Sequence, residues 1–150
     1  MSDDIYFIDA NVIMYAVGAA HPLKAPCAQI MADIGDQQIR SVTSVEVLQE
    51  ILHRFSALKR RHDAITIVQR LAFLVDEVLP ITPADMKRAL TVHQQFDELM
   101  VRDSLHAATM LNHGLTRIVT ADAHFDGLPG IVRIDPRHWQ AHRTGMSAPA

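Results

Sequence analysis

The chain has 150 residues, of which 49% are hydrophobic and 21% charged, and its formal charge is -3. This composition is typical of one globular domain, and the chain is long enough to bury a core without disulfides or metals to hold it together. A single cysteine, Cys27, excludes an internal disulfide and a cysteine-based zinc site, and no apolar run is long enough to span a membrane, so we expect a cytoplasmic protein.

Short apolar runs predict the strands of a sheet. They lie at residues 5–8, 39–42, 78–81, 117–120 and 131–134. The first run, Ile-Tyr-Phe-Ile, does not alternate between polar and apolar residues, as is typical of a strand buried on both faces of a parallel sheet.

Apolar residues recur at helical spacing in the stretches between these strands. The corresponding helices are expected at residues 22–34, 45–57, 63–76, from 83 onward and 103–113. Ser44 and Thr82 are placed to cap two of them, and Gly114 to end the last. Alternating strands and helices predict an α/β fold, a three-layer α/β/α sandwich with a mostly parallel sheet. We expect one domain over residues 1–143 and a flexible tail over 144–150.

Carboxylates stand where two of the strands end. Asp9 directly follows the strand at 5–8, with Asn11 two residues later, and Asp122 follows the strand at 117–120. Ligands of open parallel sheets bind beyond the carboxyl ends of the strands. Several acids at one such edge repel one another, and a divalent cation is the usual remedy.

Three further carboxylates lie on predicted helices. Glu46 and Glu50 are four residues apart and share one face of the helix at 45–57, which we place opposite its apolar face. Asp103 opens the helix at 103–113. These acids are far apart in the sequence, but the fold class allows them to converge at one edge of one sheet.

Each acid also has an ordinary structural explanation. Asp9 can cap a short helix that follows it, and Asp103 can cap the last long helix. Glu50 can pair with Arg54 one turn later, and Asp122 can belong to a turn. Taken together, acids at several strand and helix ends favour a site over a set of unrelated caps.

Four motifs occur in order along the chain. They are Phe-Ile-Asp-Ala-Asn at 7–11, Thr-Ser-Val-Glu-Val-Leu-Gln-Glu at 43–50, Arg-Asp-Ser-Leu-His-Ala-Ala at 102–108 and Ile-Val-Thr-Ala-Asp-Ala-His-Phe at 118–125. In this order and spacing they resemble the motifs of PIN-domain nucleases, most closely the VapC-type ribonuclease toxins of toxin–antitoxin pairs. The resemblance runs from about residue 5 to 136.

The resemblance implies a metal-dependent endoribonuclease that leaves a 5′-phosphate and a 3′-hydroxyl. Asn11 and Thr120 would orient a quartet of catalytic and metal-binding acids. That quartet is Asp9, Glu50, Asp103 and Asp122. The spacing from the end of the second strand favours Glu50 over Glu46 for the glutamate position. The implied cofactor is Mg²⁺ or Mn²⁺, with one ion or two left open.

The resemblance also implies an RNA substrate, a cognate antitoxin protein and a homodimer. Basic residues near the motifs are the candidates for contacts with RNA phosphates. They are Arg54, Lys59, Arg60, Arg61 and Arg102. Aromatic residues make up only 5% of the chain, which argues against a base-stacking platform and favours selection of the RNA by its shape. We expect His106, one turn beyond Asp103, to be a partly buried, hydrogen-bonded histidine rather than a zinc ligand.

The net charge does not oppose an RNA partner. Removing the four acids of the quartet from the 17 Asp and Glu leaves 13, against 14 Lys and Arg.

Two other functions stay open. An aspartate-based phosphohydrolase would need a second Asp two residues after the first, where this chain has Asn11. A non-catalytic α/β interaction module would use the acids only as caps.

Overall fold

A computed structural model describes residues 4–145 and shows a five-stranded sheet in which every pairing is parallel. The strands lie in the order β3-β2-β1-β4-β5. Their bounds are Ile5–Ile8 for β1, Arg40–Ser44 for β2, Glu77–Leu79 for β3, Arg117–Val119 for β4 and Val132–Ile134 for β5. The predicted parallel sheet is therefore confirmed.

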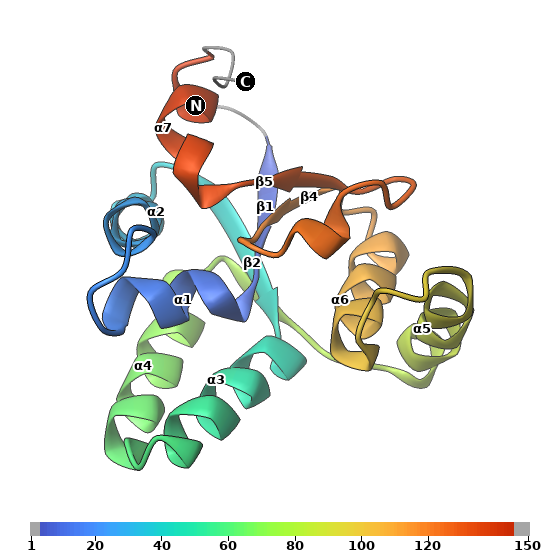
Figure 1. Cartoon of the computed structure of the whole chain (residues 1–150), viewed down its shortest axis with the longest axis horizontal. Helices are drawn as coiled ribbons and strands as arrows, with labels where there is room; N and C mark the ends of the chain where they lie inside the picture. Colours follow the sequence, from blue (N-terminus) through green and yellow to red (C-terminus); the bar gives the residue numbers. More distant parts are fainter. Residues whose placement is uncertain (1–3, 146–150) are drawn as a thin grey trace.

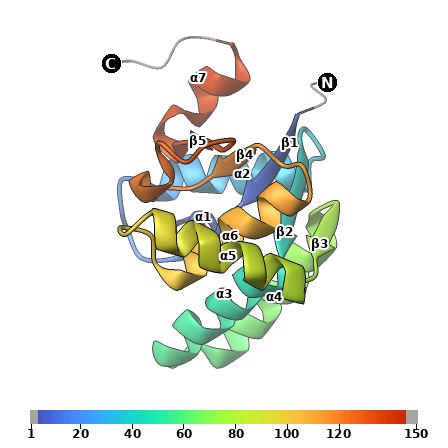
Figure 2. The ribbon, with the colours of Figure 1, turned by 90° about the vertical axis from the view of Figure 1, so that its right-hand side faces the viewer.

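Helices cover both faces of this sheet. They are α1 (Ala10–Val17), α2 (Lys24–Gly35), α3 (Val45–Ala57), α4 (Arg61–Leu74), α5 (Pro83–Gln95), α6 (Val101–Asn112) and α7 (Trp139–Arg143). In Figure 1, α1 and α2 lie to the left of the sheet, and α5 and α6 lie to the right. Figure 2, turned by 90°, places α5 and α6 in front of the strands. The predicted three-layer α/β/α sandwich is confirmed.

The strand order places β1 at the centre of the sheet. The chain runs outward from β1 to β2 and β3, and then returns to β4 on the other side of β1. Ligands of open α/β sheets bind where the strand order reverses in this way, here between the ends of β1 and β4. The register pairs Ile8 with Val119, and the Asp9 N–H donates to the Val119 carbonyl at 3.2 Å. Asp9 therefore lies beside Thr120.

The core packs against both faces of β1. Phe7 and Ile8 are fully buried, as the unbroken apolar run predicts, and Ile118 and Val119 of β4 are buried beside them. No helix within residues 4–145 is long and apolar enough to cross a membrane.

Side-chain caps set several helix ends as predicted. Ser44 Oγ accepts the Val47 N–H at 3.2 Å at the start of α3, and Thr82 forms a capping box with Asp85 at the start of α5. Gly114, with φ of 69°, follows the end of α6. α3 spans the residues that the sequence predicts.

Other element ends differ from the predictions; a tertiary contact explains one of them and a proline explains another. α4 ends at Leu74 because Asp76 pairs with Ser41 of β2 through two hydrogen bonds of 2.8 Å. β3 ends before Pro80, which has no N–H to donate to the ladder. α2 begins at Lys24 rather than at residue 22. The remaining strand ends shift by one or two residues.

α6 begins at Val101, two residues before the predicted start. Its N-cap is Met100, so Asp103 lies inside the first turn, and the explanation of Asp103 as a helix cap is wrong. At the other end of the chain, the predicted tail at 144–150 lies mostly outside the described residues. Thr144 closes the last turn of α7, where its hydroxyl donates to the Gln140 carbonyl at 3.1 Å.

Candidate active site

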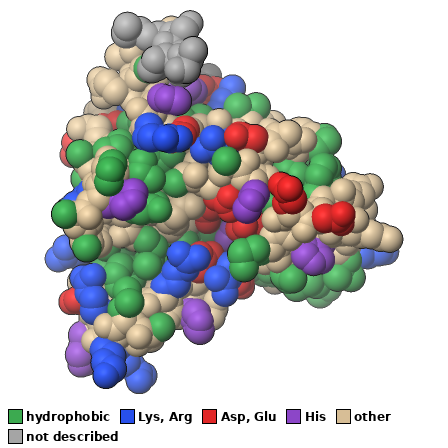
Figure 3. Space-filling model, viewed as in Figure 1, with side chains coloured by type: hydrophobic (Ala, Val, Ile, Leu, Met, Phe, Trp, Pro, Cys, Tyr) green, Lys and Arg blue, Asp and Glu red, His purple; other side chains and the backbone are tan. Residues whose placement is uncertain are grey.

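A cavity of about 650 Å³ lies beyond the ends of β1 and β4. All four acids of the predicted quartet line it: Asp9, Glu50, Asp103 and Asp122. Figure 3 shows acidic side chains gathered near the middle of this face, with Lys and Arg side chains below them and a hydrophobic area beside them. We call this cavity the acidic cleft.

Asp9 is held by contacts on both carboxylate oxygens. Oδ1 accepts the Ala10 N–H at 2.7 Å, so Asp9 caps α1, while Oδ2 accepts the Thr120 hydroxyl at 2.8 Å. The residue is only 3% exposed. Burial raises the pKa of Asp9, and the nearby His106 and the Thr120 hydrogen bond oppose that rise only in part. The cap and the site thus use the same carboxylate.

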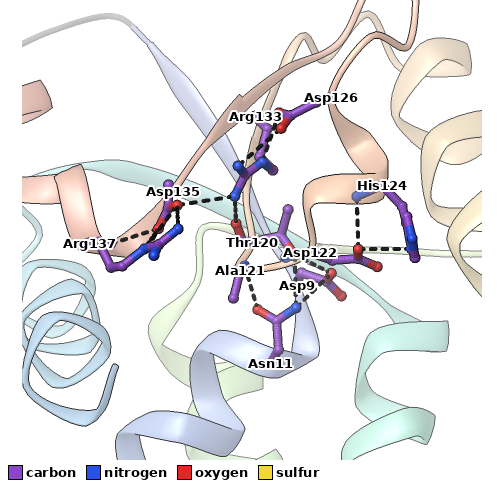
Figure 4. A network of polar contacts seen from close by, with 10 residues as sticks. All are labelled: Asp9, Asn11, Thr120, Ala121, Asp122, His124, Asp126, Arg133, Asp135 and Arg137. Carbon is purple, nitrogen blue, oxygen red and sulfur yellow. Dashed lines mark hydrogen bonds and ion pairs between the residues drawn. The ribbon is translucent and has the colours of Figure 1, made fainter. Parts of the chain in front are cut away.

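Asn11 clamps the end of β1 to the segment after β4. Its Nδ2 donates to Thr120 Oγ1 at 2.8 Å and to Asp9 Oδ2 at 3.4 Å, and its Oδ1 accepts the Ala121 N–H at 3.1 Å (Figure 4). This geometry suits the orienting role that the family resemblance implies for Asn11 and Thr120.

Asp122 is held by its own turn. Its N–H donates to Thr120 Oγ1 at 3.1 Å, and its Oδ1 accepts the His124 N–H at 2.9 Å.

The sequence did not identify Arg133, which donates to the Thr120 carbonyl at 3.2 Å and pairs with Asp126 at 2.8 Å (Figure 4). An arginine inside the apolar strand run at 131–134 is the signal that could have identified it.

Glu50 enters the acidic cleft from α3. It is 6% exposed, and its carboxylate lies 3.3 Å from Arg54 Nε and 3.4 Å from His106 Nε2. Burial alone would raise the pKa of Glu50, but His106, Arg54 and Arg102 outweigh burial and lower it. Although the sequence places Glu50 opposite the apolar face of its helix, it is buried, because α6 packs over this side of α3 and brings His106 onto it.

Glu46 lies at the margin of the site. It pairs with Arg102 at 3.4 Å, its side chain is 25% exposed, and it is not among the residues that line the acidic cleft. The geometry therefore favours Glu50 over Glu46 as the fourth acid.

His106 is fully buried between the acids, whereas the sequence indicated partial burial. Its Nε2 lies 3.4 Å from Glu50 Oε1 and 3.7 Å from Asp9 Oδ1. Within the described residues, Nδ1 has no hydrogen-bond partner. Burial alone would lower the pKa of His106, but the contact with Glu50 and the charges of Asp9 and Asp103 raise it. Ligand atoms of Asp9, Glu50 and His106 lie within 4.8 Å of one another, a spacing that can hold a metal ion.

Asp103 lies close to other acids of the site. Burial and the nearby carboxylates of Asp9 and Asp122 together raise the pKa of Asp103 to about 7. Like-charged acids at such short range destabilise one another in the ionised form. A divalent cation between them would relieve this repulsion, and carboxylate oxygens are ligands that such a cation prefers.

The five predicted RNA contacts do not lie together. Arg54 and Arg102 line the acidic cleft, with side chains 51% and 34% exposed. Arg60 lines an adjoining cavity, whereas Lys59 and Arg61 line neither of the two.

Comparisons with known proteins agree with this geometry. A profile of the PIN domain matches residues 6–131. The chain belongs to the PIN-domain family. Within that family it is similar to ribonuclease VapC13 of Mycobacterium tuberculosis, with 40% identity over 127 residues that cover 85% of this chain and 97% of the relative. Ribonuclease VapC23 of the same species is 39% identical over 119 residues, which cover 77% of this chain and 91% of the relative.

Solved structures share the PIN-domain fold. DNA-bound VapBC of Salmonella typhimurium aligns with a TM-score of 0.68 at 14% identity, over 89% of this chain and 98% of that one. VapC20 of Mycobacterium tuberculosis, described as a toxin that cleaves the sarcin-ricin loop, aligns with a TM-score of 0.64 at 20% identity, over 81% and 90%. These structures confirm the predicted fold. The PIN-domain match and the relatives described above confirm the prediction of a VapC-type ribonuclease.

Proposed function

We propose that this PIN domain, over residues 1–143, hydrolyses RNA phosphodiester bonds with a divalent cation held in the acidic cleft. The observation that supports this most directly is the convergence of four carboxylates from distant parts of the chain on one cavity. Asp9, Glu50 and Asp103 are the residues that would hold the cation. Oxygen ligands of this kind suit Mg²⁺ or Mn²⁺.

When bound, the cation supplies Lewis-acid stabilisation of the charge that develops on the attacked phosphate and activates the attacking water. The chain's own residues prepare this chemistry. Asn11 and Thr120 fix the orientation of Asp9, and Asp122 faces the same cavity from the turn after β4. Arg54 and Arg102 are placed to contact the phosphates on either side of the cleaved bond.

The partners are a further part of the proposal. Structures with this fold include a VapBC assembly, and another is described as a toxin–antitoxin complex from Klebsiella pneumoniae. By analogy, we propose that the chain is the toxin of such a pair, acts in the cytoplasm as a homodimer, and is inhibited by an antitoxin protein. An aspartate-based phosphohydrolase is not favoured, because Asn11 is held in the clamp where that class needs a second carboxylate.

The test is the Asp103→Asn variant, assayed for cleavage of single-stranded RNA with Mg²⁺ or Mn²⁺. We expect cleavage to fall by about 100-fold or more, because the variant removes one negative charge from the cation site. Stabilisation of the protein by Mn²⁺ in thermal scans should fall as well. The wild-type protein should not hydrolyse p-nitrophenyl phosphate.

Asp36→Asn is the matched control, since Asp36 is an exposed carboxylate at the end of α2 and lines neither cavity. It should cleave RNA like the wild type. Undiminished metal-dependent cleavage by a folded Asp103→Asn protein would contradict the proposed function.

A further inference from the structure

A second cavity, of about 430 Å³, adjoins the acidic cleft. Asn11, Tyr15 and Arg54 line both cavities, so the two form one continuous groove. The groove follows α3 away from the acids toward Leu58, about 12 Å along the helix from Glu50. A strand whose phosphate is cleaved at the acids can therefore continue into this second cavity, which we call the side groove.

Two aromatic rings in tilted contact form part of the side groove. The ring centroids of Tyr15 and His21 lie 4.6 Å apart, with 33° between their planes. His21 is exposed, and its Nδ1 accepts the Leu23 N–H at 3.0 Å, which fixes the orientation of the ring. The pair thus presents a π surface at a defined place in the wall.

The loop that carries His21 is tightly constrained. At Gly18, where α1 ends, an added Cβ would lie 2.6 Å from the Met14 carbonyl oxygen, so the chain turns at a place where only glycine fits. The Lys24 ammonium donates to the Gly18 carbonyl and closes the loop from the other side. A constrained loop loses little conformational entropy when a ligand stacks on it.

The walls of the side groove combine positive charge with apolar surface. Arg54 and Arg60 line it with side chains 51% and 38% exposed, and Leu58, 62% exposed, lies between them in the chain. Among the described residues that line it there is no carboxylate, and the acids paired with the two arginines, Glu50 at 3.3 Å from Arg54 and Asp63 at 3.0 Å from Arg60, lie outside the lining. Cations beside a stacking surface are typical of sites for single-stranded nucleic acid, because the cations contact phosphates and the rings contact bases.

We infer that the side groove binds the RNA strand next to the cleaved phosphate, with one nucleobase stacked on the Tyr15–His21 pair. Arg54 and Arg60 hold the adjoining phosphates. The low aromatic content of the chain does not oppose this role, because a single pair needs only two rings. The inference rests on the proposed ribonuclease function and adds a determinant of substrate choice outside the acids.

The test measures RNA binding in the Asp103→Asn background with Mg²⁺, so that the RNA stays intact. The probe is a short fluorescent single-stranded RNA, followed by fluorescence anisotropy. Tyr15→Ala should weaken binding about 5- to 150-fold, the range that corresponds to loss of one base–aromatic stack. His21→Ala, a change at an exposed residue, should weaken it in the same direction, and Tyr15→Phe should preserve it because the ring remains.

A double-mutant cycle identifies the stacked base. A series of RNAs, each with one abasic nucleotide, should contain one whose binding is no weaker to Tyr15→Ala than to the parent protein, since the stack is already missing. Phe73→Ala is the matched control. Phe73 is an aromatic residue of α4, 87% exposed, that lines neither cavity, and its loss should leave binding unchanged.

Equal RNA affinity of Tyr15→Ala and its parent would overturn the inference, as would additive losses at every abasic position. Weaker binding of a protein partner to Tyr15→Ala, with RNA binding intact, would also overturn it and assign the side groove to that partner. A wild-type protein that fails to cleave RNA contradicts the proposed function instead. The two failures are therefore distinguishable.

Discussion

Asp9 shows why a single acid is hard to interpret from sequence. From the sequence, a helix cap and a catalytic carboxylate are alternative roles for Asp9. In the structure, Asp9 accepts the Ala10 N–H with one oxygen and contacts Thr120 with the other. The cap orients the carboxylate and so prepares the site. Glu50 likewise forms the ion pair with Arg54 that an ordinary surface explanation predicts, and also lines the acidic cleft.

The two glutamates of α3 offer a matched comparison at the residue scale. Glu50→Gln should lower RNA cleavage about 100-fold, because Glu50 is buried in contact with His106 and would share the cation with Asp9. Glu46→Gln should lower cleavage less than about tenfold, because Glu46 only pairs with the half-exposed Arg102. Steady-state cleavage rates and Mn²⁺ affinity by calorimetry measure both effects.

The opposite ranking of the two variants would move Glu46 into the quartet.

Contacts that depend on tertiary packing could not be predicted from the sequence. His106 is separated from Glu50 by 56 positions, and its burial follows from how closely α6 approaches α3. Acids that directly follow strands were predictable, since the sheet itself determines where they lie.

At the scale of elements, the sequence predicted the ends that local chemistry determines. Ser44 and Thr82 cap their helices through their own side chains, and α3 and α5 begin where predicted. The end of α4 depends instead on hydrogen bonds between Asp76 and Ser41, which lie in different elements. Local patterns contain no information about such a pairing.

α7 depends on one carboxylate of α2 for its docking. Asp33 Oδ2 accepts the Trp139 indole N–H at 2.8 Å and an Arg143 N–H at 2.9 Å, and Trp139 is 1% exposed. Asp33→Ala should destabilise the protein by about 2 kcal/mol, because it leaves a buried indole N–H unsatisfied. Asp33→Asn should cost less, since its amide oxygen can still accept one of these bonds.

Urea unfolding followed by Trp139 fluorescence measures these losses. Folded Asp33→Ala protein should retain its RNA cleavage, because none of these three residues lines the acidic cleft. Equal stability of the two variants would show that the charge, and not the indole hydrogen bond, determines the docking of α7.

The whole molecule determines the site through its strand order. Asp9 and Asp122 are 113 positions apart, and they meet only because the chain returns from β3 to pair β4 with β1. The motifs predicted which acids form one site, but the sequence of residues 5–134 did not predict the order of the strands in the sheet. Right-handed crossovers limit the possible topologies without selecting one.

The acidic cleft should make the stability of the metal-free protein depend on pH. Burial and neighbouring acids raise the pKa of Asp103 to about 7, and burial raises that of Asp9. The folded state therefore holds these protons more tightly than the unfolded chain. The stabilisation of the folded state that comes from these raised pKa values is fully present below about pH 4 and is lost as the pH rises through about 7. The lowered pKa of Glu50 has the opposite effect on the pH dependence of stability. The stabilisation that Glu50 contributes is lost only when the pH falls through the acidic range.

Thermal scans in EDTA should therefore give a lower Tm at about pH 8 than at about pH 6. Mg²⁺ or Mn²⁺ should raise the Tm more at the higher pH, since the cation then replaces protons that the acids have already lost. Asp103→Asn removes one of the groups that titrate in this window, while His106, whose pKa is also raised, remains, so its metal-free Tm should change less between the two pH values. If Asp103→Asn and the wild type lose the same Tm over this range, repulsion at Asp103 does not destabilise the metal-free protein.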